Sequence, residues 1–196
     1  MEVDVAVEEG AGDPGMATPE VRSLAMHVLA HEGVIDAAAG PLELLVWFVG
    51  EERMAEMNRS HMGRSGPTDV LSFPIDGHPH LGLVPGDAVA CRQAPHGAGE
   101  SLEEAYGVSE VTGRRPGAAR GLPVIGNGVP WMVGDVVVCA AVARRQSAAT
   151  GTSPRDEVAK LIVHGILHLL GMDHEEEDEA QRMEAREEEL LRTWQH

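Results

Sequence analysis

The sequence predicts one globular domain, or one domain with an appendage, in which short β-strands are interspersed with amphipathic helices. Three observations lead to this expectation. A chain of 196 residues that is 43% hydrophobic is large enough to bury one core. Several short stretches are continuously apolar or alternate apolar with polar residues, as strands do. Longer stretches repeat their apolar residues every three or four positions, which is typical of helices with one buried face.

The first strand and helix are expected near the N-terminus. Residues Val3–Val7 alternate apolar with polar residues, which predicts a half-buried strand. A loop over 10–15 follows. Thr18 is then expected to be the N-cap of a helix, with Pro19 in its first helical position. The inward face of this helix would carry Val21, Leu24, Ala25, Val28 and Leu29.

The central part of the chain predicts three more strands and two helices. The apolar stretch Leu42–Val49 is expected to be a strand, and Glu51–Ser60 a short helix with Met54 and Met57 facing inward. Val70–Phe73 is expected to be an edge strand, because Pro74 closes it and proline cannot donate to a ladder. A strand over Val136–Cys139 runs into an alanine-rich helix near 140–149.

Residues 77–131 differ in character from the rest of the chain. They hold eleven of the 23 glycines and six of the 12 prolines, and their apolar residues follow no period. Such a composition predicts an irregular or flexible insertion rather than part of the core.

The segment Ser153–His174, with the sequence SPRDEVAKLIVHGILHLLGMDH, predicts a buried helix. Ser153 with Asp156 three residues later resembles a capping box, and Pro154 suits the first turn. Gly171 is expected to end the helix, because glycine tolerates the left-handed conformation there. The helix is apolar around most of its girth, with Val158, Leu161, Ile162, Ile166, Leu169 and Leu170.

Two histidines on this helix and a third after it predict a metal site. His164 and His168 are four residues apart, so they lie on one helix face, and His174 follows the turn at Gly171. Three neutral histidine nitrogens hold Zn²⁺ and leave a fourth position for water. The alternative is that these are ordinary core histidines. A set at 0, +4 and +10 with glycine at +7 favours the metal site, because this is the pattern of the long zincin motif.

One position departs from the zincin motif. Metalloproteases of that type carry a glutamate directly after the first histidine, where it acts as the general base. Gly165 stands at that position here. The pattern therefore predicts the ligand set without the base of a peptidase.

The sequences HGILHLLGMDH, from His164 to His174, and PTDVLSFP, from Pro67 to Pro74, resemble the YbeY family of bacterial rRNA-maturation endoribonucleases. The start of the strand at Gly134 and an acidic last helix also match. That helix begins with the run 175–179 and has an apolar face made of Ala180, Met183, Leu190, Leu191 and Trp194. The resemblance covers residues 3–76 and 132–195.

This resemblance implies an α+β fold, with a small mixed β-sheet flanked by helices and a zincin-like metal-binding helix in a single domain over 1–196. It implies that His164, His168 and His174 bind one Zn²⁺ per chain. It also implies cleavage of single-stranded RNA, with roles in 16S rRNA 3′-end maturation and ribosome quality control. The implied partners are single-stranded rRNA and the ribosomal small subunit or its assembly proteins.

Two features depart from the family pattern. Many members carry an arginine five residues before PTDVLSF, and the corresponding residue here is Met62. Arg59 and Arg64 are the neighbouring candidates for RNA binding and weak candidates for catalysis. The second departure is the insertion over 77–131, which is longer than the connection in the family.

Other polar residues carry weaker predictions. Asp173 could orient a ligand, act as a general base or cap the following helix, and capping is the commonest of these roles. Asp69 is expected to bond backbone in a turn rather than to take part in chemistry. His61 could reach the cleft in which the substrate binds, or it could simply lie at the end of its helix. Cys91 and Cys139 do not form a disulfide framework.

Charge and hydropathy exclude several classes of protein. With 15 basic against 32 acidic residues, the net charge is −17, so RNA cannot be held by a general cationic surface. The longest apolar run has eight residues, short of the roughly 18 that a transmembrane helix needs. No basic flank or apolar stretch of a secretory signal begins the chain, so we expect a cytoplasmic protein.

The sequence therefore predicts a cytoplasmic, zinc-dependent endoribonuclease acting on single-stranded rRNA, with no membrane partner. Two alternatives stay open. One is a zincin-like metallopeptidase, against which the missing glutamate at Gly165 argues. The other is a non-catalytic ribosome-assembly factor with a structural zinc, against which three protein ligands rather than four argue.

Overall fold

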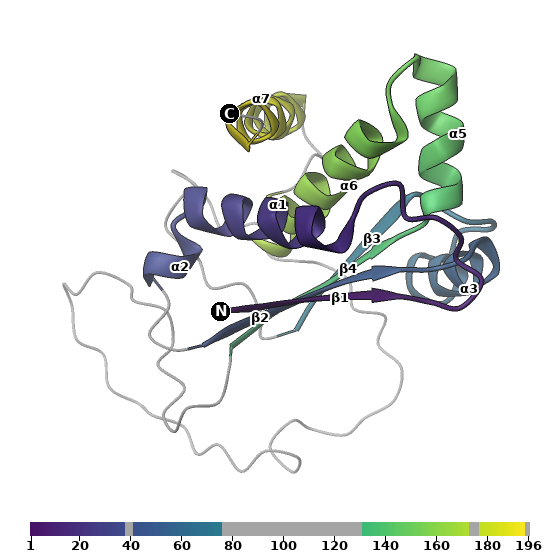
Figure 1. Cartoon of the computed structure of the whole chain (residues 1–196), viewed down its shortest axis with the longest axis horizontal. Helices are drawn as coiled ribbons and strands as arrows, with labels where there is room; N and C mark the ends of the chain where they lie inside the picture. The colour runs from purple at the N-terminus through teal and green to yellow at the C-terminus, as the bar shows by residue number, and fades with distance from the viewer. Residues whose placement is uncertain (38–40, 76–130, 173–176, 195–196) are drawn as a thin grey trace, which may run out of the picture.

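Four strands form one mixed sheet in the order β1-β2-β4-β3, with the helices around it (Figure 1). The computed structural model describes residues 1–37, 41–75, 131–172 and 177–194. The predicted α+β fold with a small mixed sheet is confirmed. The predicted insertion over 77–131 lies outside the described residues, except for its last residue.

The strands are β1 (Glu2–Val7), β2 (Leu42–Phe48), β3 (Val70–Pro74) and β4 (Trp131–Val138). Strands β1, β2 and β4 are parallel to one another, and β3 runs antiparallel to β4. Strand β3 lies at one end of the sheet order, which confirms the edge strand predicted from Pro74.

Helices cover the two faces of the sheet unequally. Alternate residues of a strand point to opposite faces of the sheet, and β4 has buried residues on both faces. Val136 packs in the main core with α1 (Thr18–His31), α6 (Pro154–Leu169) and α7 (Glu177–Trp194). Val137 packs in a smaller cluster on the other face, with Met54 of α3 (Glu51–Met62). The predicted burial of Met54 is confirmed, and Met57 packs half-buried beside it.

Two further helices complete the described part of the chain. Helix α5 (Ala140–Thr150) follows β4 directly, as the alanine-rich stretch predicts. Helix α2 (Val34–Ala37) is a single turn that the sequence pattern did not indicate. None of the described helices is long and apolar enough to cross a lipid bilayer.

Both ends of α6 have the predicted caps. The Ser153 hydroxyl accepts a hydrogen bond from the backbone N–H of Asp156 at 3.1 Å. At the other end Gly171 takes a positive φ of 90°. The N–H of Gly171 donates to the carbonyl of His168, and that of Met172 donates to Leu167. This pair of bonds is the Schellman motif, so the chain turns sharply at the end of the helix.

Some predicted boundaries are wrong by a few residues. The N-cap of α1 is Ala17 rather than Thr18. The Glu20 carboxylate accepts a hydrogen bond from the Ala17 N–H, so the third helical residue supplies the cap that the alanine side chain lacks. Strand β4 begins five residues before the predicted Val136. Trp131, placed in the predicted insertion, is buried and pairs with Leu42 of β2.

Helix α6 approaches the sheet closely at Gly165. A β-carbon placed on Gly165 would lie 2.6 Å from Cγ1 of Val136 and 3.2 Å from the Ser72 hydroxyl. The same hydroxyl donates to the carbonyl oxygen of Gly165 at 3.0 Å. The glycine therefore fixes how closely the histidine-bearing helix packs on β3 and β4.

We predict that Gly165→Ala lowers the free energy of unfolding, because the added methyl overpacks the contact with Val136 at a cost of about 1–3 kcal/mol. Alanine favours a helix over glycine by roughly 1 kcal/mol, so the expected net loss is up to about 2 kcal/mol. Urea unfolding of the full chain measures it. Lys160→Ala, on the exposed side of the same helix, should change stability by no more than about 0.5 kcal/mol. An unchanged or raised midpoint for Gly165→Ala would contradict the packing argument.

Candidate metal centre

The two histidines of α6 meet through their Nε2 atoms. His164 and His168 are half-buried and lie one turn apart, with ring centroids 4.5 Å apart and ring planes at 84°. Their Nε2 atoms are 3.0 Å from each other. The predicted convergence of these two side chains is confirmed.

A backbone carbonyl orients His168. Its Nδ1 lies 2.9 Å from the carbonyl oxygen of Met172. A carbonyl oxygen can only accept a hydrogen bond, so Nδ1 of His168 must carry the proton that it donates. In the neutral ring this leaves the lone pair on Nε2, which is the atom that faces His164.

A buried carboxylate from α7 holds His164. Its Nδ1 lies 2.6 Å from Oε1 of Glu187, whose side chain is only 6% exposed. No motif in the sequence points to Glu187, although its position on the helix carries a signal. Glu187 lies four residues after Met183 and three before Leu190, within the apolar face of α7, and a charged residue at such a position is rarely buried without a partner.

This arrangement fits a bound cation. When Nδ1 of each ring donates to its oxygen, both lone pairs lie on the Nε2 atoms, and two lone pairs facing each other are favourable only with positive charge between them. Two tetrahedral Zn–N bonds of roughly 2.0–2.1 Å would separate the nitrogens by about 3.3 Å, close to the 3.0 Å observed.

The third predicted ligand, His174, lies outside the described residues, as does Asp173. Within the described parts of the chain, no group of three metal-binding side chains is found. The complete ligand set therefore stays a prediction.

The position of Gly165 bears on the peptidase alternative. The residue after the first histidine faces the sheet, and Val136 and Ser72 occupy the space around its missing side chain. A glutamate would not fit there while α6 keeps this distance from β4. The packing therefore agrees with the absence of the peptidase general base at this position.

Asp69 organises the entry into β3. Its carboxylate accepts hydrogen bonds from the Val70 N–H and the Thr68 hydroxyl at 2.9 Å, and from the Gln146 amide at 2.8 Å. Burial opposes ionisation of this carboxyl, but the bonds from Gln146, Thr68 and Val70 outweigh it and hold the pKa of Asp69 below its usual range. The predicted backbone-bonding role of Asp69 is confirmed.

The candidate RNA-binding arginines lie at the end of α3 and in the loop after it. Arg59 and Arg64 are exposed, and so is Met62 at the position of the family arginine. Asn58 is buried and its amide donates to the carbonyl of Gly66 at 2.8 Å, which ties this loop to the helix. Among the described residues, no contact joins either arginine to the two histidines.

His61 packs against the edge strand. Its ring lies edge-on to Phe73 of β3, with centroids 4.9 Å apart, and the residue is exposed near the end of α3. It therefore lies near the end of its helix, which is one of the two predicted positions, with its ring beside β3.

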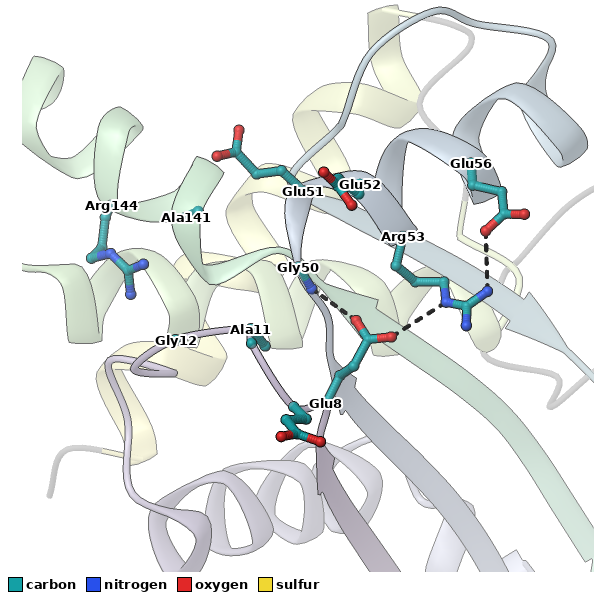
Figure 2. A pocket seen from close by; sticks show the side chains of 12 residues that line it. Glu8, Ala11, Gly12, Gly50, Glu51, Glu52, Arg53, Glu56, Ala141 and Arg144 are labelled. Atoms are coloured by element: carbon teal, nitrogen blue, oxygen red, sulfur yellow. Dashed lines mark hydrogen bonds and ion pairs between the residues drawn. The ribbon is translucent and has the colours of Figure 1, made fainter.

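A separate hollow of about 590 Å³ lies where β1 and β2 end (Figure 2). The Glu8 carboxylate points into it, accepting bonds from the Gly50 N–H at 3.1 Å and from Arg53 at 3.4 Å. The lining carries five glutamates and two arginines: Glu8, Glu9, Glu51, Glu52, Glu56, Arg53 and Arg144. This excess of negative charge opposes RNA, so the hollow is a poor candidate for the substrate site.

Comparison with known proteins identifies the family. The family model described as "Endoribonuclease YbeY" matches residues 10–195. The chain belongs to this family. The resemblance seen in HGILHLLGMDH and PTDVLSFP is thereby confirmed.

Two curated members of the YbeY family are similar to this chain over at least 90% of their own length. A protein from Salinispora tropica named endoribonuclease YbeY is 37% identical over 194 residues, covering 99% of this chain and 96% of the relative. One from Acidothermus cellulolyticus with the same name is 35% identical, covering 95% and 90%. A solution structure of a Thermotoga maritima protein aligns with 99% of the chain at 18% identity and a TM-score of 0.48.

The bonds of Asp69 generate a pH-dependent prediction. The pKa of this carboxyl is lowered on folding, so its stabilisation is fully present above about pH 4, the usual pKa of an aspartate in an unfolded chain. It is lost as the pH falls through the lower pKa of the folded state. Asp69→Asn should therefore destabilise the protein at pH 7, and the difference from wild type should shrink as the pH falls below about 4.

Urea unfolding at a series of pH values tests this. Asp36→Asn removes the same charge from an exposed site on α2 and serves as the control. A difference between wild type and Asp69→Asn that does not vary with pH would show that the charge of Asp69 contributes nothing.

Proposed function

We propose that this chain is a single-strand-specific, metal-dependent endoribonuclease of the cytoplasm, where ribosomal RNA is found, acting in 16S rRNA 3′-end maturation and ribosome quality control. Its membership of the YbeY family supports this proposal. One observation carries the metal dependence. The Nε2 atoms of His164 and His168 lie 3.0 Å apart, and Nδ1 of each ring is hydrogen-bonded to an oxygen.

In this proposal His164, His168 and His174 hold one Zn²⁺ ion per chain. When bound, the ion lowers the pKa of a water to roughly 7 and polarises a phosphoryl oxygen. The side chain of His164 is 26% exposed, which supports access of an RNA strand to this site. Asp173 follows Met172 directly and remains a candidate for accepting a proton near the ligands.

RNA would reach the centre along the edge strand β3 and the loop before it. Arg59 and Arg64 would attract the phosphates, and the exposed ring of His61 offers a surface on which a base can stack. The other proposed partners are the ribosomal small subunit or its assembly proteins, because the substrate is part of that particle.

The alternatives differ in what they need at the site. A metallopeptidase needs a general base, and the contacts around Gly165 leave no room for a glutamate there. A non-catalytic assembly factor with a structural zinc would be expected to have four protein ligands. RNA cleavage by the metal-replete protein, beside a peptide library as the negative control, separates the three functions.

We predict that His164→Ala, His168→Ala and His174→Ala each lower the zinc content and abolish cleavage of single-stranded rRNA fragments, because two ligands are too few to retain the ion. Metal analysis of the purified variants and a cleavage assay measure the two effects. His31→Ala, at an exposed position at the end of α1, should retain both. Full zinc occupancy in all three variants would overturn the three-histidine site, and cleavage by fully demetallated protein would overturn the metal dependence.

A second prediction concerns RNA binding by this acidic protein. Arg59→Ala and Arg64→Ala should weaken binding and reduce the slope of log K against log salt by roughly 0.7 for each lost phosphate contact. Zinc content should not change. Arg22→Ala removes the same charge from the exposed side of α1 and should leave the slope unaltered. An unaltered slope in the double variant of Arg59 and Arg64 would exclude this loop as the RNA contact.

A further inference from the structure

We propose that Glu187 is a positioning residue, which holds His164 in the tautomer that presents Nε2 to the metal. The inference rests on the proposed metal dependence and extends it to a residue of α7, outside the histidine motif. It assigns Glu187 no direct contact with substrate or metal.

The first support is the burial of the carboxylate. Glu187 is 5% exposed and lies between Met183 and Leu190, which are also buried. A buried carboxylate is costly unless it is paired and hydrogen-bonded. The side chain would pack at least as well if it were apolar, so packing alone gives no reason for an acid at this position.

The second support is the direction of its hydrogen bond. An ionised carboxylate only accepts, so the 2.6 Å contact places the proton of His164 on Nδ1. The lone pair then lies on Nε2, which faces Nε2 of His168. A carboxylate behind a ligating imidazole also raises the basicity of the nitrogen that binds the metal.

The third support is the contrast between the two histidines. The partner of His168 is the main-chain carbonyl of Met172, in the turn that ends α6 itself. The partner of His164 is a side chain on a different helix. Glu187 is therefore the one of these two acceptors that a substitution can remove without disturbing the backbone of α6.

Neighbouring contacts of α7 fix the position of Glu187 relative to α1 and α6. The adjacent Arg186 bonds Glu32 at 2.6 Å and the carbonyl of His31 at 3.2 Å, which anchors this turn of α7 to the end of α1. Near the end of α7, the guanidinium of Arg155 lies 4.9 Å from the ring centre of Trp194. Helix α7, which carries the Glu187 carboxylate, is thus held by contacts with both α1 and α6.

The deciding variant is Glu187→Met in the full-length protein. Methionine has a similar length, favours helices and cannot accept the hydrogen bond. We expect zinc affinity, measured by competition with a chromophoric chelator, to fall about 10- to 100-fold. The urea midpoint of the metal-free protein should be unchanged or raised, because a buried charge is replaced by an apolar group. A purely structural role predicts the opposite: a lower midpoint with wild-type zinc affinity.

Two matched variants and one spectrum complete the test. Glu187→Gln should weaken zinc binding less than Glu187→Met, because its amide oxygen can still accept from Nδ1. Glu188→Gln changes the neighbouring exposed glutamate and should bind zinc like wild type. Nitrogen-15 NMR of the metal-free protein should show His164 with its proton on Nδ1, and a mixture of tautomers in Glu187→Met.

The outcomes separate this proposal from the proposed function. Wild-type zinc affinity in Glu187→Met, or the same His164 tautomer in both proteins, would overturn the role of Glu187. A wild-type protein that binds no zinc would instead overturn the metal dependence, and the tautomer comparison would still show whether Glu187 controls His164.

Discussion

The contact between Gly165 and the sheet is the constraint on which the geometry of the candidate site depends. Because no side chain separates α6 from Val136 and Ser72, the helix has one rotation at which it can pack so closely. At about 100° per residue, His164 lies about 100° to one side of Gly165, and His168 lies about 60° to the same side. The packing of one glycine thus places both imidazoles on one flank of α6, where His164 contacts Glu187 of α7.

Helix α7 supplies the carboxylate that bonds His164 of α6. Most of its acidic residues are exposed, whereas Glu187 is buried against His164. The apolar residues on either side of Glu187 pack in the main core with α6. The burial of Met183 and Leu190 therefore places a carboxylate at Nδ1 of His164, and an acceptor at that atom directs Nε2 toward His168. The packing of α7 in the core therefore also orients the candidate ligand His164.

The parts of this structure that sequence predicted well are those set by local chemistry. Ser153 and Gly171 act through hydrogen bonds within one or two turns, and Pro154 acts through its fixed φ, so the limits of α6 followed from residue type alone. The edge position of β3 followed from Pro74 for the same reason. The pairing of His164 with His168 needed only the helical period.

The parts that sequence predicted poorly depend on contacts between distant segments. The cap at Ala17 is formed by Glu20 in place of a side chain on the cap residue, and the first residue of β4 is fixed by pairing with Leu42. Glu187 could have been noticed as an acid within the apolar face of α7, but its partner lies 23 positions earlier on another helix. A helical wheel indicates that such an acid needs a partner, and only the packing of α6 with α7 identifies it.

The charge distribution along α3 suggests how an acidic protein could still attract RNA to one place. The helix has 12 residues and is therefore about 18 Å long. Glu51, Glu52 and Glu56 lie in its first half and line the acidic hollow, whereas Arg59 and His61 lie in its last turn and Arg64 follows in the loop.

Acids at the N-terminus and bases at the C-terminus both stabilise the helix dipole, so this polarity needs no functional origin. In the proposed function this polarity would repel phosphates from the ends of β1 and β2 and attract them to the end of α3 that lies beside β3. At physiological salt the screening length is about 8 Å, less than half the length of the helix. The basic end can therefore act on a nearby RNA strand largely unopposed by the acids at the other end of the helix.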